Sequence, residues 1–288
     1  MRYQALFIIY MLIAGCSGNK TSPYVEYIDQ SVSIPVDTSI AIKVEAFKKP
    51  PFYGQVNHDS LDVNHGQMTY IGATPAAFAG SILAHALIVG ATGDSKKKAE
   101  QERADKILEP YKENIAAFNA VDLIEISKVD LQKKNIPFIA WEAETNHPWV
   151  VQSHPVFFLS QDRSTLTLKN AVSITELDNQ EKPAYQNLIE VVSSPNKDKK
   201  IIPIDSLGEL SIKLFVDSLM AMKAELSENR KPENKEMTLS FFSGGEKVYE
   251  RGRIISEECN RMTFRTLRGW VKSVPTIAKE PSPVCLES

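Results

Sequence analysis

Two β-rich runs separated by a short polar break constrain the fold of this chain more than any other feature of its sequence. Residues 150–159 and 164–174 are rich in β-branched and aromatic side chains, and the residues between them, 160–163, are all polar. Runs of this length with a turn-like break between them are typical of a hairpin. The sequence therefore predicts antiparallel strand pairing in this part of the chain.

Further strands are predicted on the C-terminal side of this hairpin. Residues 185–193 favour one strand, and residues 238–243 and 247–256 favour two more that flank a Ser-Gly-Gly-Glu sequence. That sequence resembles a phosphate-binding loop only superficially, because the required glycine spacing is missing, and a hairpin turn is preferred. Residues 262–272 are predicted to form a third strand after this hairpin.

One long helix is predicted within this strand-rich region. A Ser-x-x-Glu capping box begins at residue 206, and a broad apolar face continues to about residue 229. We expect the helix at 206–229 to pack on the sheet. The predicted fold class is α+β, with mostly antiparallel sheet or sheets and several packed helices. The pattern divides near residue 135 into a helix-rich part, 31–135, and a β-rich part, 136–288.

The helix-rich part begins with a strand pattern. Residues 31–47 alternate between apolar and polar side chains, which predicts a half-buried strand. Residues 94–118 show helical spacing, with a kink expected at Pro110. Residues 119–132 are compatible with a helix followed by a strand, and their periodicity does not decide the point.

The first sixteen residues carry a different kind of signal. A single positive charge precedes an apolar run at 5–14, which suits the hydrophobic region of a signal peptide and is too short for a membrane-spanning helix. The run ends in Ile13-Ala14-Gly15-Cys16. A branched apolar residue, two small residues and a cysteine in this order resemble the lipobox of bacterial lipoproteins.

This resemblance implies that residues 1–15 are removed and that Cys16 is acylated, with 16–30 forming the lipidated end and a tether. Attachment of two or more acyl chains to Cys16 would anchor the protein stably in a lipid membrane. The residue after Cys16 is Ser17 rather than Asp, which is similar to lipoproteins sorted to the outer membrane. The implied location is the periplasmic face of the bacterial outer membrane.

The other two cysteines are predicted to pair with each other. Once Cys16 is assigned to lipid, Cys259 and Cys285 remain, and an oxidising compartment such as the periplasm permits a disulfide between them. The alternative is two unpaired thiols.

An uncharged stretch at 70–91 contains small residues at every fourth position, namely Gly72, Ala76, Gly80 and Ala84. Rows of small residues allow another backbone to approach closely. Three interpretations remain open: a buried helix packed on a sheet, which we favour, a contact surface for another protein or a second copy, and a membrane span. The four small residues are the candidate interaction residues.

Four residues are weak candidates for a metal site, namely His58, Asp59, Asp62 and His65. Their side chains include metal-ligating groups, but the spacing matches no structural zinc pattern, and a loop is the preferred interpretation. The sequence also lacks the nucleophile-elbow and zinc-protease motifs. We therefore expect no cofactor and assign no catalytic residue.

The overall charge of the chain argues against one class of function. The chain has 33 Lys and Arg against 36 Asp and Glu, a net charge of −3, which argues against a nucleic-acid partner. The sequence favours a membrane-anchored, periplasm-facing lipoprotein with a structural or protein-interaction role, and with an envelope protein as a possible partner. The alternatives are an anchored periplasmic hydrolase and a periplasmic protein that binds a ligand or lipid.

Overall fold

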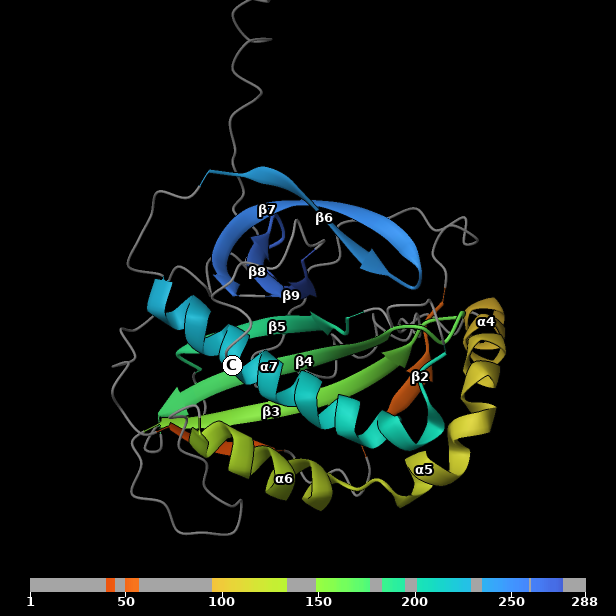
Figure 1. Cartoon of the computed structure of the whole chain (residues 1–288). Coiled ribbons are helices and arrows are strands. Elements are labelled where there is room, and N and C mark those ends of the chain that lie inside the picture. Colours follow the sequence, from red (N-terminus) through yellow and green to blue (C-terminus); the bar gives the residue numbers. More distant parts are fainter. Residues whose placement is uncertain are drawn as a thin grey trace, which may run out of the picture.

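The fold is built on one large mixed sheet (Figure 1). The computed structural model describes residues 40–44, 50–56, 95–133, 149–176, 183–194, 201–228, 235–258 and 260–276. Within them a nine-stranded sheet has the strand order β1-β3-β4-β5-β9-β8-β7-β6, and β2 also pairs with β3. The strands are β1 (Ile40–Val44), β2 (Phe52–Gly54), β3 (Trp149–Leu159), β4 (Leu166–Glu176), β5 (Tyr185–Val192), β6 (Met237–Ser243), β7 (Glu246–Glu258), β8 (Arg261–Thr266) and β9 (Val271–Pro275).

Most strand pairs in this sheet are antiparallel. The exceptions are β1 with β3, β2 with β3, and β5 with β9, which are parallel. The predicted α+β fold class with a mostly antiparallel sheet is confirmed.

Helix α7 packs on one face of the sheet against β4, β5 and β9, and α6 lies beside it (Figure 1). The helices are α4 (Ser95–Asp105), the 3-10 helix η2 (Lys106–Tyr111), α5 (Lys112–Ala117), α6 (Ala120–Lys133), the 3-10 turn η3 (Ile204–Ser206) and α7 (Leu207–Glu228). Helix α7 thus forms where the sequence predicts one at 206–229.

The main core lies between α7 and the sheet. Alternate residues of a strand point to the same face, and Val151, Leu168 and Ile189 are fully buried in one apolar cluster. Phe215 and Leu219 of α7 are fully buried in the same cluster. This apolar burial holds α7 against the central strands.

A second, smaller apolar cluster stabilises the C-terminal strands. Met262 and Phe264 of β8 belong to it. The residues that alternate with them, Arg261, Thr263 and Arg265, therefore point to the opposite side of β8, toward α7. This alternation places polar and charged side chains of β8 against the helix.

Both predicted hairpins are present. Strands β3 and β4 pair antiparallel from Trp149 opposite Glu176 to Leu159 opposite Leu166. Strands β6 and β7 are joined at Gly244 and Gly245, whose φ angles are 59° and 74°. Glycine adopts positive φ without a steric penalty, which explains why these two residues form the tight turn.

The prediction of a single strand at 262–272 is wrong. The structure contains two strands there, β8 and β9, which pair antiparallel with Arg265 opposite Val271. Gly269 has a φ of 87°, and the Thr266 amide donates to the Trp270 carbonyl at 2.8 Å. A left-handed residue closed by this hydrogen bond reverses the chain within a run that looks continuously β-prone.

The helix-rich part differs from expectation in its details. Pro110 lies inside η2, which separates α4 from α5, so the expected break takes the form of a 3-10 segment. Residues 119–132 contain one helix, α6, rather than a helix and a strand. Strands β1 and β2 pair with β3, so the regions 31–135 and 136–288 contribute to the same sheet.

Candidate functional site

Helix α7 and strand β8 carry charged residues at matching intervals along their contact, which we call the α7–β8 seam. Asp217 and Glu225 are eight residues apart on α7, about 12 Å along a helix. Arg261 and Arg265 are four residues apart on β8, about 13 Å along a strand. Arg261 Nε lies 3.6 Å from Asp217 Oδ2. Arg265 Nη2 lies 3.0 Å from Glu225 Oε1. The seam therefore has an ion pair at each end.

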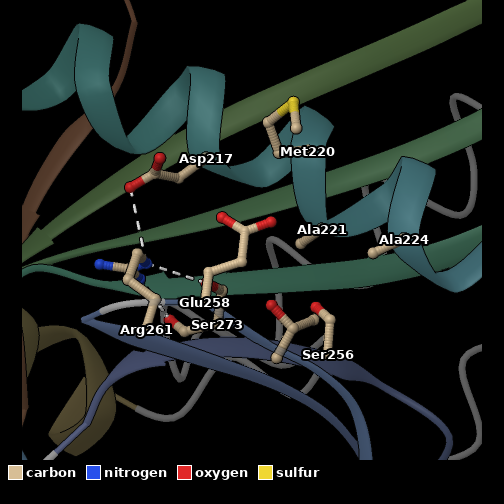
Figure 2. A pocket seen from close by; sticks show the side chains of 9 residues that line it. Asp217, Met220, Ala221, Ala224, Ser256, Glu258, Arg261 and Ser273 are labelled. Carbon is tan, nitrogen blue, oxygen red and sulfur yellow. Dashed lines mark hydrogen bonds and ion pairs between the residues drawn. The ribbon is translucent and has the colours of Figure 1, made fainter. Parts of the chain in front are cut away.

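A pocket opens in the seam at the Asp217–Arg261 end (Figure 2). Its helix side is formed by Asp217, Met220, Ala221 and Ala224. Its strand side carries Glu258, Arg261 and the hydroxyl groups of Ser256, Thr263 and Ser273. Because the alanines reach only a short way toward the sheet, space remains between the helix and the strands.

Arg261 is held in a fixed position at this pocket. Its Nε donates to Ser273 Oγ at 3.0 Å, and its Nη2 donates to the Ser273 carbonyl at 2.7 Å and the Val192 carbonyl at 3.0 Å. Burial lowers the pKa of Arg261, while the carboxylates of Asp217 and Glu258 act in the opposite direction. An arginine remains charged under such a shift, so the pocket contains a fixed, partly desolvated cation.

Asp217 is less well satisfied than Arg261. Its Oδ2 atom is buried and has no hydrogen-bond partner within the described part of the chain. The distance of 3.6 Å to Arg261 Nε is an ion-pair distance and too long for a good hydrogen bond. A buried acceptor without a donor is costly, so the pocket favours a group that can donate a hydrogen bond to Asp217.

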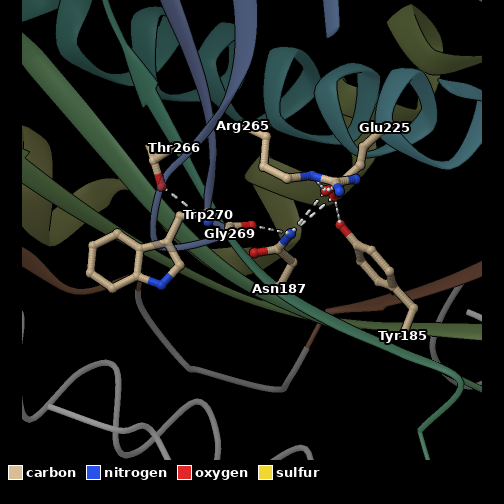
Figure 3. A network of polar contacts seen from close by, with 7 residues as sticks. All are labelled: Tyr185, Asn187, Glu225, Arg265, Thr266, Gly269 and Trp270. Atoms are coloured by element: carbon tan, nitrogen blue, oxygen red, sulfur yellow. Dashed lines mark hydrogen bonds and ion pairs between the residues drawn. The ribbon is translucent and has the colours of Figure 1, made fainter. Parts of the chain in front are cut away.

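Glu225 has the opposite environment (Figure 3). Its carboxylate is fully buried and accepts hydrogen bonds from the Tyr185 hydroxyl, from Asn187 Nδ2 and from Arg265 Nε, the latter two at 3.0 Å. Asn187 Nδ2 also lies 3.1 Å from the Gly269 carbonyl, to which it donates. This network joins α7 to β5, to β8 and to the turn between β8 and β9.

Burial raises the pKa of Glu225, although Arg265 and the hydrogen bonds from Tyr185 and Asn187 oppose the shift. Perturbed carboxyl groups occur both in active sites and in structural networks. Here both oxygens are bonded by protein donors, so the arrangement is that of an internal cross-link.

A second, partly buried charge cluster lies on the other side of the sheet from α7. Lys169, Glu190 and Lys272 occupy one row across β4, β5 and β9. Lys272 Nζ lies 3.1 Å from Glu190 and 2.8 Å from Glu250. Lys169 Nζ lies 5.1 Å from the centre of the Phe158 ring. Because the negative Glu190 lies between two lysines, each charge in the row has an opposite charge on the neighbouring strand.

The pKa directions agree with this compensation. Burial opposes ionisation of Lys272, but Glu190 and Glu250 raise its pKa overall. Burial likewise opposes ionisation of Glu190, but Lys272 and Lys169 lower its pKa overall. Lys169 differs, because burial lowers its pKa and Glu190 only partly offsets the effect. This cluster stabilises the sheet and does not open into the α7–β8 seam.

The candidate residues predicted from sequence lie outside the described residues. This applies to the lipidation site, to the cysteine pair, to the weak metal candidates and to the small-residue row: Cys16, Cys259, Cys285, His58, Asp59, Asp62, His65, Gly72, Ala76, Gly80 and Ala84. Those predictions remain predictions.

Within the described residues, no three His, Cys, Asp or Glu side chains are grouped so that they could hold a metal ion. In the same part of the chain, no helix combines the length and apolar character needed to cross a membrane.

Sequence reasoning missed the seam, although two signals point to it. Phe215, Ser218, Met222 and Glu225 follow one another at helical spacing and are all buried, so Glu225 interrupts the buried stripe of the predicted helix with a charge. On β8, the two arginines alternate with Met262 and Phe264. A charge within a buried stripe requires a buried partner, and an arginine facing the helix is such a partner.

Comparisons with protein-family models, with curated proteins and with solved structures find no match to this chain.

Proposed function

We propose that this chain is a lipoprotein anchored through acylated Cys16 at the periplasmic face of the bacterial outer membrane. Its folded part has a structural or protein-interaction role in the cell envelope. The observation that carries the proposal is the apolar run at 5–14 followed by Ile13-Ala14-Gly15-Cys16. The single positive charge, the run length and the cysteine position all fit a lipoprotein signal sequence.

The surface of the folded part supports an interaction role. Strand β6 is the last strand of the described sheet, so one of its edges has no strand partner there. Unpaired edges are available for strand addition by another chain. Met237, a large apolar residue at the start of β6, is also exposed.

The test is a Cys16→Ser variant of the full chain, compared with the parent and with a matched Cys259→Ser variant. We expect the parent and Cys259→Ser to incorporate labelled palmitate and to fractionate with the outer membrane. We expect Cys16→Ser to lose the label and the association with the outer membrane. Unchanged fractionation of an unlabelled Cys16→Ser protein with the outer membrane would overturn the anchor. Crosslinking from the edge of β6 then tests for an envelope protein partner.

A second candidate function, binding of a small ligand, is favoured by one specific observation. Within the described residues, Asp217 Oδ2 is a buried acceptor without a donor, and it lies at a pocket that also contains three hydroxyl groups. The free volume of the pocket is about 20 Å³, so it fits a hydroxyl or amine group of a few atoms and not a whole sugar. A thermal-shift screen of ammonium, methylamine and small alcohols against the parent and Asp217→Ala tests this candidate, and a shift that is equal in both proteins would show that binding does not occur at this pocket.

A further inference from the structure

Strand β7 presents a row of exposed basic and aromatic side chains, which we call the β7 stripe. It consists of Lys247, Tyr249, Arg251 and Arg253. Residues two apart point to the same face of a strand, and four such residues extend over about 20 Å. Tyr249 is 65% exposed, and the Arg251 and Arg253 side chains are 61% and 58% exposed.

The residues between them fix the strand in place. Val248 packs against the second apolar cluster, and Glu250 forms an ion pair with Lys272 at 2.8 Å. A Cβ atom on Gly252 would lie 2.5 Å from the Arg265 carbonyl oxygen and 2.7 Å from the Phe264 ring. Strand β7 therefore lies directly against β8 at this point, and the β7 stripe is displayed on a rigid support.

Within the described part of the chain, the neighbours of the β7 stripe on β6 do not compensate its charge. Across the hairpin, Lys247 faces Phe242, Tyr249 faces Ser240 and Arg251 faces Thr238, all of which are uncharged on β6.

Arg251 and Arg253 share one acidic partner on this face. Glu236 contacts both arginines, at 3.5 Å to Arg251 and 3.0 Å to Arg253. Three cations with one shared carboxylate form a local positive surface on a chain whose net charge is −3.

We propose that the β7 stripe binds the anionic phospholipid headgroups of a bilayer. Arginine guanidinium groups form paired hydrogen bonds with phosphate oxygens. A tyrosine between them is suited to the headgroup level, where its ring contacts apolar material and its hydroxyl stays hydrated.

The choice of a bilayer rests on the proposed function. A protein tethered through Cys16 stays within reach of the membrane, so a weak surface contact is formed at high effective concentration. The contact orients the tethered sheet relative to the bilayer.

The test uses the mature chain, residues 16–288, carrying Cys16→Ser, so that neither acyl chains nor the apolar run at 5–14 contribute to binding. We expect this protein to cosediment with vesicles of phosphatidylcholine containing phosphatidylglycerol, and not with phosphatidylcholine alone. Binding should weaken as salt is added, because the contact is electrostatic. Since a basic residue near an anionic membrane contributes about fivefold, the triple variant Lys247→Gln/Arg251→Gln/Arg253→Gln should lose on the order of 100-fold in affinity.

A matched control removes the same amount of charge elsewhere. Arg103→Gln/Lys112→Gln/Lys133→Gln replaces three exposed cations on the helices, and it should bind as the parent does. Circular dichroism establishes that both triple variants fold. A third variant, Tyr249→Ser, keeps the charge and should lose less than the triple variant.

Two results would overturn the proposal. The first is absence of binding to the anionic vesicles, and binding to heparin in that case would indicate a polyanionic sugar partner instead. The second is equal loss in both triple variants, which would indicate that net charge alone causes the binding. Each leaves the palmitate result for Cys16 unchanged, so failure here and failure of the anchor are distinguishable.

Discussion

The two ends of the α7–β8 seam contain the same pair of chemical groups in different environments. At one end Glu225 is fully buried and accepts hydrogen bonds from three side chains. At the other end the Asp217 and Arg261 side chains are each 17% exposed, and Asp217 Oδ2 has an arginine no closer than 3.6 Å. One end is closed and saturated, and the other opens into a pocket.

The difference arises from what surrounds each carboxylate. Tyr185 and Asn187 of β5 provide Glu225 with donors, and their bulk excludes water. Around Asp217 the neighbouring pocket residues are small, with Ala221 on the helix and Ser273 on the sheet. A buried charge bonded on all sides fixes the fold, whereas a partly bonded charge beside empty space can bind a further group.

The largest expected effect is at the closed end. Glu225→Ala leaves Arg265, Asn187 and the Tyr185 hydroxyl without their common acceptor in a buried site. Removing one partner of a buried ion pair typically costs about 3–5 kcal/mol. Urea denaturation followed by circular dichroism should show a loss of this size in the free energy of unfolding.

A conservative variant provides the control. Glu225→Gln keeps the size and one acceptor oxygen, so its loss should be clearly smaller than that of Glu225→Ala. If Glu225→Ala cost no more than the corresponding change at Asp217, the proposed contrast between the two ends would be wrong.

The pH dependence of stability gives the next largest effect. Because burial raises the pKa of Glu225, the folded state binds this proton more tightly than the unfolded state does. The contribution of this group to stability is therefore present at acidic pH and is lost as pH rises from the ordinary glutamate pKa through the raised one. Each pKa unit corresponds to about 1.4 kcal/mol.

The measurement compares the parent with Glu225→Gln by urea denaturation across that pH window. The stability advantage of the parent over the variant should shrink as pH rises. An advantage that is constant with pH would mean that the proton is bound equally in the folded and unfolded states.

Much of the fold was predictable because its strands carry local signals. The hairpin of β3 and β4 follows from two β-rich runs and a polar break, and α7 follows from a capping box and a broad apolar face. The turn at Gly269 was missed, since a single glycine among β-prone residues indicates a turn only when its φ is known. Parallel pairing of β1 with β3 was also unpredictable, because it joins residues more than one hundred positions apart.

The seam was harder to predict than the fold. It depends on Glu225 and Arg265, which are 40 positions apart in the sequence, and on the depth at which α7 packs. Each residue alone is typical of a solvent-exposed position, since Glu and Arg are seldom fully buried. They meet because eight residues of helix and four residues of strand span nearly the same distance. This match brings the charges into contact only when α7 lies alongside β8.

A smaller effect is expected at the open end. Asp217→Ala removes an ion pair that is longer than a hydrogen bond, while Arg261 keeps its bonds to Ser273 and Val192. The cost should be about 1 kcal/mol, the value typical of one polar contact. The same urea denaturation as for Glu225→Ala measures it. A loss as large as at the closed end would mean that Asp217 is a structural anchor, and the ligand-binding candidate would lose its basis.

The smallest expected effect comes from filling the pocket. Ala224 lines it and is only half-buried, so Ala224→Leu should place its side chain in free space and change the free energy of unfolding by less than about 1 kcal/mol. Ala221, one turn earlier, is 3% exposed and belongs to the main core, so the same change there should cost about 1–3 kcal/mol through overpacking. Thermal denaturation of the two variants side by side measures the contrast. Equal losses would mean that the space beside Ala224 is closed, and the open end of the seam would then resemble the closed one.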